Sequence, residues 1–166
     1  MEIDGGGVDY STKFTIFTDG SALNNKAEAP AGMAFFVPNK KILISKSMIA
    51  TNNQAELEAI RYALWWFKEK LADEVVPDNT LFVFSDSAYS INAITGKWKK
   101  LKENVKKINV CKMLIKQIEE TRCVKTVFIH VKAHTRKKDF VSLNNDIVDH
   151  EARKKATEQA EGDKDE

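Results

Sequence analysis

Cysteine and long apolar segments are both scarce in this sequence of 166 residues. The two cysteines, Cys111 and Cys123, form no CxxC pair, which argues against a disulfide framework and a cysteine-rich zinc module. The longest apolar runs, such as residues 63–67, fall far short of the roughly 20 residues that span a bilayer, and no signal-peptide pattern follows Met1. We therefore expect an intracellular protein of the cytoplasm or nucleus that does not bind membranes.

An excess of one charge sign is also absent, because 26 basic and 24 acidic residues give a formal net charge of only +2. Hydrophobic residues make up 43% of the chain, which excludes a wholly disordered protein, and the length fits a single domain. The charges are nevertheless segregated. Residues 96–117 contain eight lysines and one acid, whereas residues 157–166 contain five acids and one lysine.

Strand and helix patterns alternate along the chain. Runs of β-branched and aromatic residues predict strands over residues 13–18, 31–37, 41–49, 81–85 and 124–131. Apolar residues at helical spacing predict helices over residues 54–71, 87–95, roughly 105–120 and 144–159. We expect the first three strands to be antiparallel neighbours. The order of the elements predicts an α/β layer fold.

Composition also predicts where the folded part begins and ends. Residues 1–12 contain a glycine triplet and no apolar periodicity, so we expect a flexible lead-in. Residues 13–157 are expected to form the domain. The acidic residues 158–166 are expected to form a frayed tail.

Four acids are candidates for one shared site: Asp19, Glu56, Asp86 and Asp149. Asp19 and Asp86 each end an expected strand, and the carboxyl ends of neighbouring parallel strands form the crevice where open α/β sheets bind ligands. Glu56 lies in one helical row with Ile60, so it is expected to face the sheet. Because clustered carboxylates repel one another unless cations lie between them, this grouping points to Mg²⁺ or Mn²⁺.

Each acid also has a purely structural interpretation when it is taken alone. Asp19 precedes Gly20 and is compatible with a turn. Glu56 fits an acid that the helix dipole stabilises in the first turn. Asp86 is compatible with the N-cap of the following helix, and Asp149 with a surface ion pair to Arg153. The expected convergence of all four on one sheet favours the shared site.

The strings TDGS, TNNQAELEAI and SDSAY, and VKAH followed by NNDIVDHEA, resemble the type 1 ribonuclease H family over most of the chain, from Lys13 to Lys155. The resemblance implies a ribonuclease H-like fold, in which helices flank a mixed sheet of three antiparallel and then two parallel strands. It also implies an enzyme that hydrolyses the RNA strand of RNA/DNA hybrids. The implied mechanism uses two Mg²⁺ ions, with Mn²⁺ as a substitute, and leaves 5′-phosphate and 3′-hydroxyl ends.

Through the resemblance, all four acids are carried over as metal-binding catalytic residues, with Asp19 as the bridge between the ions. His134 matches a mobile-loop histidine that assists proton movement or product departure. The expected substrate contacts are Gly20, Ser21, Asn25, Asn52, Asn53, Gln54, Trp98, Lys99 and Lys100. The last three belong to the basic segment 96–117, which we interpret as a surface that tracks backbone phosphates.

The sequence departs from the family pattern at several positions. Ala133 stands where the family has a glycine before His134, and the stretch from His134 to Asp149 is longer than expected. Gln54 replaces an arginine that is common in the family. Ala88 replaces a polar residue. The segment from Ile94 to Val110 is shorter than in members with a full basic helix there.

Two further functions fit the same residues. One is the ribonuclease H domain of a retroelement or viral reverse transcriptase, although the lead-in and the acidic tail favour a free-standing protein. The other is a non-catalytic nucleic-acid-binding module of the same fold, which the presence of all four acids disfavours. We expect a monomer without an obligate protein partner.

Overall fold

The computed structural model describes residues 7–97, 103–132 and 139–164. Its elements, in chain order, are the 3₁₀ helix η1 (Tyr10–Thr12), β1 (Phe14–Ala22), β2 (Ala29–Val37), β3 (Ile42–Ala50), α1 (Asn52–Lys70), the 3₁₀ helix η2 (Pro77–Asn79), β4 (Thr80–Ser85), α2 (Ala88–Ile94), α3 (Val105–Arg122), β5 (Lys125–His130) and α4 (Phe140–Lys164). None of the described helices is long and apolar enough to cross a membrane.

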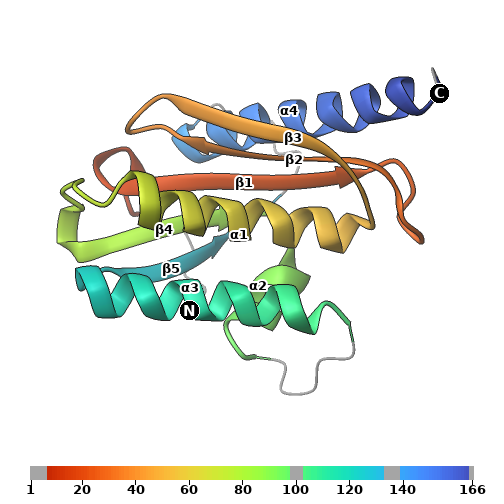
Figure 1. Cartoon of the computed structure of the whole chain (residues 1–166). Helices are drawn as coiled ribbons and strands as arrows, with labels where there is room; N and C mark the ends of the chain where they lie inside the picture. Colours follow the sequence, from red (N-terminus) through yellow and green to blue (C-terminus); the bar gives the residue numbers. More distant parts are fainter. Residues whose placement is uncertain (1–6, 98–102, 133–138, 165–166) are drawn as a thin grey trace.

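The strands form one sheet in the order β3-β2-β1-β4-β5 (Figure 1). β1 pairs antiparallel with β2, and β2 pairs antiparallel with β3. β4 pairs parallel with β1, and β5 pairs parallel with β4. The predicted mixed sheet of three antiparallel and two parallel strands is therefore confirmed.

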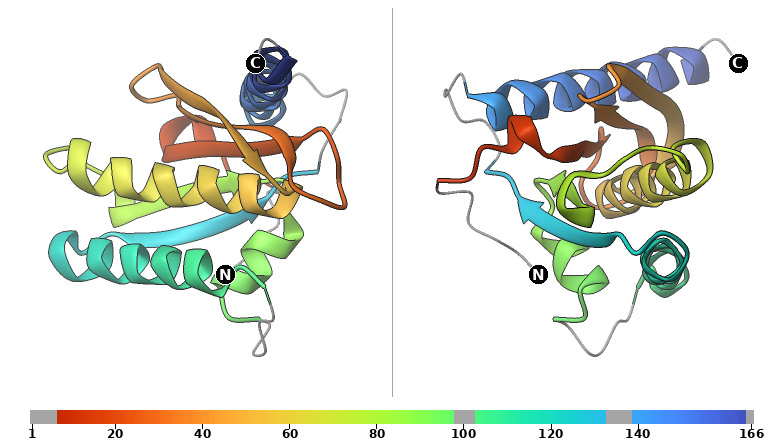
Figure 2. Two further views of the ribbon diagram at one scale, coloured as in Figure 1. Left: turned by 45° about the vertical axis from the view of Figure 1, so that its right-hand side comes forward. Right: turned by 90° about the vertical axis from the view of Figure 1, so that its left-hand side faces the viewer.

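Helices cover both faces of the sheet (Figure 2). α4 lies on one face, where its Val148 and Ala152 pack with Phe17 and Phe84 of the sheet. α1 and α3 lie side by side on the other face, over a larger apolar core. The approach of α4 is close at Gly32 of β2, where an added Cβ atom would lie 2.1 Å from the carbonyl oxygen of Ala152.

The predicted row on α1 determines which way this helix faces. Ile60, Ala63 and Phe67 are all buried against the sheet, together with Glu56. The helix starts at a capping box, in which the Thr51 hydroxyl accepts from the Gln54 N–H and the Gln54 side chain accepts from the Thr51 N–H. Next to the cap, the Asn52 side-chain oxygen accepts from the Ala22 N–H at 3.2 Å, and this hydrogen bond holds the start of α1 against the end of β1.

Regular structure extends beyond both expected ends of the domain, Lys13 and Thr157. The fold begins before Lys13, because Tyr10 is buried and packs edge-on against the rings of Phe82 and Phe84. α4 starts at Phe140, which contacts the Phe17 ring, rather than at residue 144. It also continues to Lys164, so residues 158–164 are helical and not frayed. Most residues of this acidic segment are good helix formers, and their helix propensity outweighs the repulsion between their charges.

Candidate active site

Three of the four predicted acids converge at one point of the sheet. Asp19 comes from β1, Glu56 from α1, and Asp86 follows the last residue of β4. Each offers one carboxylate oxygen, and these three oxygens all lie within 4.8 Å of one another. Asp19 and Glu56 are buried, and Asp86 is partly buried.

The sequence predicted that Asp19 ends its strand, but the structure differs. β1 continues through Ala22, and Asp19 pairs with Ala34 of β2. The parallel pairing with β4 nevertheless stops at Phe17 and Phe84, so Asp19 lies just beyond it. The switch point between the antiparallel and parallel halves of the sheet is therefore where Asp19 meets Asp86.

Glu56 is fixed by the backbone of β1. It lies in the second turn of α1, so the interpretation as a first-turn acid is wrong. Its Oε1 accepts from the Gly20 N–H at 2.6 Å. A Cβ atom on Gly20 would lie 2.3 Å from the backbone of Ala55 and of Glu56, so only glycine lets the helix come this close. The other oxygen, Glu56 Oε2, is buried without a hydrogen-bond partner among the described residues.

Asp86 does not cap the helix that follows it. That role belongs to Ser87, whose side chain accepts from the Ser90 N–H. The Asp86 backbone is held instead, because its carbonyl oxygen lies 3.2 Å from His130 Nε2 at the end of β5. The carboxylate of Asp86 is thus available to the acid cluster.

Asp149 forms the predicted surface ion pair and lies near the acid cluster. On α4 it forms the surface ion pair with Arg153, at 3.2 Å between Oδ1 and Nε. It is also close enough to the cluster for its charge to raise the pKa values of Asp19 and Asp86. Asp149 therefore lies at the edge of the three-acid cluster rather than within it.

Burial dominates the electrostatics of the cluster. It raises the pKa of Asp19 to about 8, and the charges of Asp86 and Asp149 add to the shift. Burial also raises the pKa of Glu56, and the charge of Asp19 is the next contribution. The pKa of Asp86 is raised in the same way, by its burial and by the charge of Asp149. Without a cation the acids of the cluster tend to stay protonated, because ionisation of all three would place like charges together in a buried site.

The residues present fit a hard divalent cation. All donors of the cluster are carboxylate oxygens, which Mg²⁺ and Mn²⁺ prefer over nitrogen or sulfur ligands. The buried Glu56 Oε2, which has no hydrogen-bond partner among the described residues, is an oxygen that a cation would satisfy. Asp19, Glu56 and Asp86 are the residues that would hold such an ion, with Asp149 beside them.

A polar groove of about 570 Å³ lies at the start of α1. The groove is lined by the four amide residues that were predicted from the sequence as substrate contacts. Four further lining residues were not predicted. The lining consists of Asn25, Lys26, Thr51, Asn52, Asn53, Gln54, Glu103 and Asn104. Glu103 and Asn104 lie just before α3, far away in the sequence, so no local pattern could place them here. Lys26 directly follows Asn25 and could have been proposed with it.

The remaining predicted site residues divide into two groups. Gly20 and Ser21 lie on β1 directly after Asp19, and the Gly20 N–H donates to both Asp19 and Glu56. His134, Trp98, Lys99 and Lys100 lie outside the described residues. The predicted helix over residues 105–120 is present as α3, which carries the described lysines of the basic segment beyond Asn104.

Fold and site together define a mixed α/β protein with a carboxylate cluster at the switch point of its sheet, beside an amide-lined groove. A family model described as RNase H matches residues 11–157. The ribonuclease H of Chlorobium phaeobacteroides (strain BS1) is 33% identical over 134 residues, which are 74% of this chain and 84% of that protein. The chain therefore belongs to the ribonuclease H family of enzymes.

Solved structures agree with this assignment. LC11-RNase H1, isolated from compost by a metagenomic approach, has a TM-score of 0.62 and 27% sequence identity, covering 88% of this chain and 96% of that one. LC11-RNase H1 in complex with an RNA/DNA hybrid has a TM-score of 0.66 at 24% identity, covering 88% of this chain and 98% of that one. The second comparison supports the fold.

Proposed function

We propose that this protein hydrolyses the RNA strand of RNA/DNA hybrids with the help of two Mg²⁺ ions, for which Mn²⁺ can substitute. The observation that carries the proposal is the convergence of Asp19, Glu56 and Asp86 within 4.8 Å in a chain of the ribonuclease H family. The hybrid complex of LC11-RNase H1 supports the choice of substrate. Cleavage leaves 5′-phosphate and 3′-hydroxyl ends.

The acids have distinct tasks in this proposal. Asp19 would contact both cations, Glu56 and Asp86 would complete one site, and Asp149 would complete the other. When bound, two divalent ions stabilise the attacking water and the leaving 3′-oxygen of a phosphodiester. The Gly20 N–H orients Glu56, since it donates to one carboxylate oxygen and leaves the other for a ligand. His134 assists proton movement or product departure.

The groove supplies recognition of the RNA strand. Amide side chains and loop backbone are suited to the 2′-hydroxyls, which distinguish RNA from DNA in the minor groove. Asn25, Asn52 and Asn53 line the groove and are the proposed contacts, together with the backbone at Gly20 and Ser21. The side chain of Gln54 lines the groove too, but the capping box already engages its oxygen, so its amide group is the part left for a phosphate. Trp98, Lys99 and Lys100 extend the contact along the backbone.

The first prediction is that Asp86→Asn abolishes metal-dependent cleavage while the fold survives. The amide keeps the shape of the carboxylate but removes a charged ligand. A metal site contributes several kcal/mol to transition-state stabilisation, so we expect turnover to fall by about 10³-fold. Hybrid cleavage is measured in Mg²⁺, and Mg²⁺ affinity is measured by calorimetry.

Asp73→Asn is the matched control, because Asp73 is an exposed acid on the connection after α1. It should leave turnover and metal affinity unchanged. Cleavage by Asp86→Asn at the parental rate, with unchanged Mg²⁺ affinity, would remove Asp86 from the metal site and with it the basis of the proposed function.

A further inference from the structure

A second acid of α1 is buried for a reason that the acid cluster does not explain. Glu58 is only 5% exposed, yet it follows Glu56 by two residues and therefore points about 200° around the helix from it. Its carboxylate contacts Lys46 of β3 and Lys107 of α3. A carboxylate in this position requires cationic partners.

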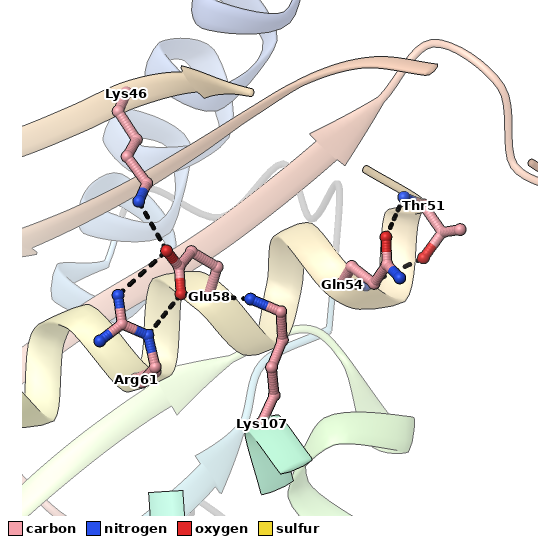
Figure 3. Close-up of polar contacts among 6 residues, drawn as sticks. All are labelled: Lys46, Thr51, Gln54, Glu58, Arg61 and Lys107. Atoms are coloured by element: carbon pink, nitrogen blue, oxygen red, sulfur yellow. Dashed lines mark hydrogen bonds and ion pairs between the residues drawn. The ribbon is translucent and has the colours of Figure 1, made fainter. Parts of the chain in front are cut away.

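Three cations from three different elements meet at Glu58 (Figure 3). Lys46 of β3 donates to Oε2 at 2.6 Å, and Arg61 of α1 donates to the same oxygen at 3.0 Å and, through Nε, to Oε1. Lys107 of α3 lies 3.5 Å from Oε1. Burial alone would favour the neutral acid, but these cations outweigh it and lower the pKa of Glu58 to about 2. Glu58 is thus ionised at neutral pH.

One carboxylate does not neutralise this cluster. Lys46, Arg61 and Lys107 carry three positive charges against one negative charge, which leaves a net charge of +2. Within the described part of the chain, no ion pair joins these cations to a second acid. Their side chains remain 41%, 30% and 36% exposed, so solvent or a ligand can reach all three.

The cluster continues the polar groove along both of its walls. Glu58 lies one helical turn beyond Gln54 on α1, on the same face, as Figure 3 shows. Lys107 lies one turn beyond Asn104, the N-cap of α3. The charged residues of the groove itself, Lys26 and Glu103, cancel each other. The cation cluster is therefore the part of this surface that carries a net positive charge.

We propose that Lys46, Arg61 and Lys107 bind a backbone phosphate of the nucleic-acid strand that occupies the groove. Glu58 holds the three cationic groups together in the folded protein, and their excess positive charge attracts the phosphate. The proposal rests on the proposed function, because it takes the strand in the groove to be part of an RNA/DNA hybrid. It extends the contact surface beyond the groove, onto α1, β3 and α3.

The test is the salt dependence of hybrid binding, measured in EDTA so that no cleavage occurs. Lys46→Gln and Lys107→Gln should each weaken binding. The double variant leaves only Arg61 paired with Glu58, so it should reduce the slope of log K against log[NaCl] by about 0.9, the value for one lost phosphate contact. Lys70→Gln is the matched control, since Lys70 is an exposed lysine at the far end of α1 and should leave the slope unchanged.

Glu58→Gln separates binding from folding. Loss of the carboxylate removes the ion pairs and should lower the melting temperature, but it also raises the local positive charge. Hybrid affinity at low salt should therefore be equal to or higher than that of the parent.

An unchanged slope in the double lysine variant, in a protein that cleaves hybrids, would overturn this proposal and leave the proposed function intact. The same holds if Glu58→Gln binds the hybrid more weakly while it remains folded, because loss of a negative charge beside a bound phosphate should not weaken binding. Failure of the parent itself to bind or cleave a hybrid would instead refute the proposed function.

Discussion

Glu56 and Glu58 lie two residues apart on α1, yet their surroundings change their proton affinities in opposite directions. Burial among other acids raises the pKa of Glu56. Glu58 is also buried, but the hydrogen bonds from Arg61 and Lys46 lower its pKa to about 2. The first carboxylate thus lacks a cation among the described residues, and the second has three. This contrast between two neighbouring residues is the reason to propose that Glu56 binds a metal ion and that Glu58 holds cationic side chains in place.

The raised pKa values predict how the stability of the metal-free protein changes with pH. Above pH 4 the folded state binds more protons than the unfolded state, because the pKa of Asp19 is raised to about 8 and the pKa values of Glu56 and Asp86 are raised as well. The free energy of unfolding in EDTA should therefore fall as the pH rises from 5 to 8. Glu58 does not affect this range, since its lowered pKa matters only below its unfolded value of 4.5.

Urea unfolding in EDTA at several pH values measures this effect. Addition of Mg²⁺ should raise the melting temperature more at pH 8 than at pH 5, since the cation replaces protons in the cluster. Asp86→Asn should show a shallower fall with pH. A metal-free stability that rises steadily from pH 5 to pH 8 would contradict the electrostatic account of the site.

Asp149 should tolerate substitution better than Asp86. Its oxygens lie outside the group of three within 4.8 Å, and Arg153 already shares its charge. Asp149→Asn is expected to lower hybrid turnover by about tenfold, which corresponds to about 1.4 kcal/mol. Parallel turnover measurements of both variants check the order. Equal losses would mean that Asp149 moves into the cluster when the substrate and metal bind.

At the element scale, the close approach of β1 and α1 builds the site. An added Cβ atom on Gly20 would meet backbone atoms of Ala55 and Glu56 at 2.3 Å, and backbone cannot rotate out of the way as a side chain can. We predict that Gly20→Ala displaces the start of α1, costs about 2 kcal/mol of folding free energy and lowers turnover through the displaced Glu56. Chemical denaturation and hybrid cleavage assays measure the two effects.

Gly162 provides the control for this prediction. It lies in α4, and an added Cβ atom there meets nothing within 4 Å. Gly162→Ala should therefore raise stability by roughly 0.5–1 kcal/mol, as expected for a helical glycine, and leave turnover unchanged. If Gly20→Ala were as stable and active as Gly162→Ala, the contact between β1 and α1 would not position Glu56.

Local patterns were sufficient to predict most elements and the three central acids. The row of Glu56 and Ile60 follows from helical periodicity alone, and Asp86 follows from the apolar run before it. The extension of β1 to Ala22 could not be predicted in this way, because Gly20 and Ser21 are typical turn residues and only their pairing with β2 makes them a strand. The start of α4 depends likewise on the contact between Phe140 and Phe17.

Contacts between distant segments explain what sequence reasoning missed in the site. The ion pair of Glu58 with Arg61 has the i,i+3 spacing of a helix and can be predicted from the sequence. Lys46 and Lys107 reach the same carboxylate from β3 and α3, and no spacing rule connects these segments. The same limit applies to Asn104, which lines the groove from the start of α3.

At the scale of the whole molecule, the helices on the two faces of the sheet contribute different parts of the site. α4 packs tightly on one face and places Asp149 beside the cluster, while α1 and α3 cover the other face and form the groove with its cationic extension (Figure 1). The acid cluster lies where these parts meet. A strand in the groove would therefore pass the cluster on one side and the cations of Lys46, Arg61 and Lys107 on the other.

The most direct test of this account is strand-resolved cleavage of matched substrates in Mg²⁺. An RNA/DNA hybrid is compared with single-stranded RNA, duplex RNA and duplex DNA of the same sequence, with EDTA as the metal-free control. The account predicts that only the RNA strand of the hybrid is cut, that the products carry 5′-phosphate and 3′-hydroxyl ends, and that EDTA abolishes cleavage. Cleavage of duplex DNA at a comparable rate, or of the hybrid in EDTA, would contradict it.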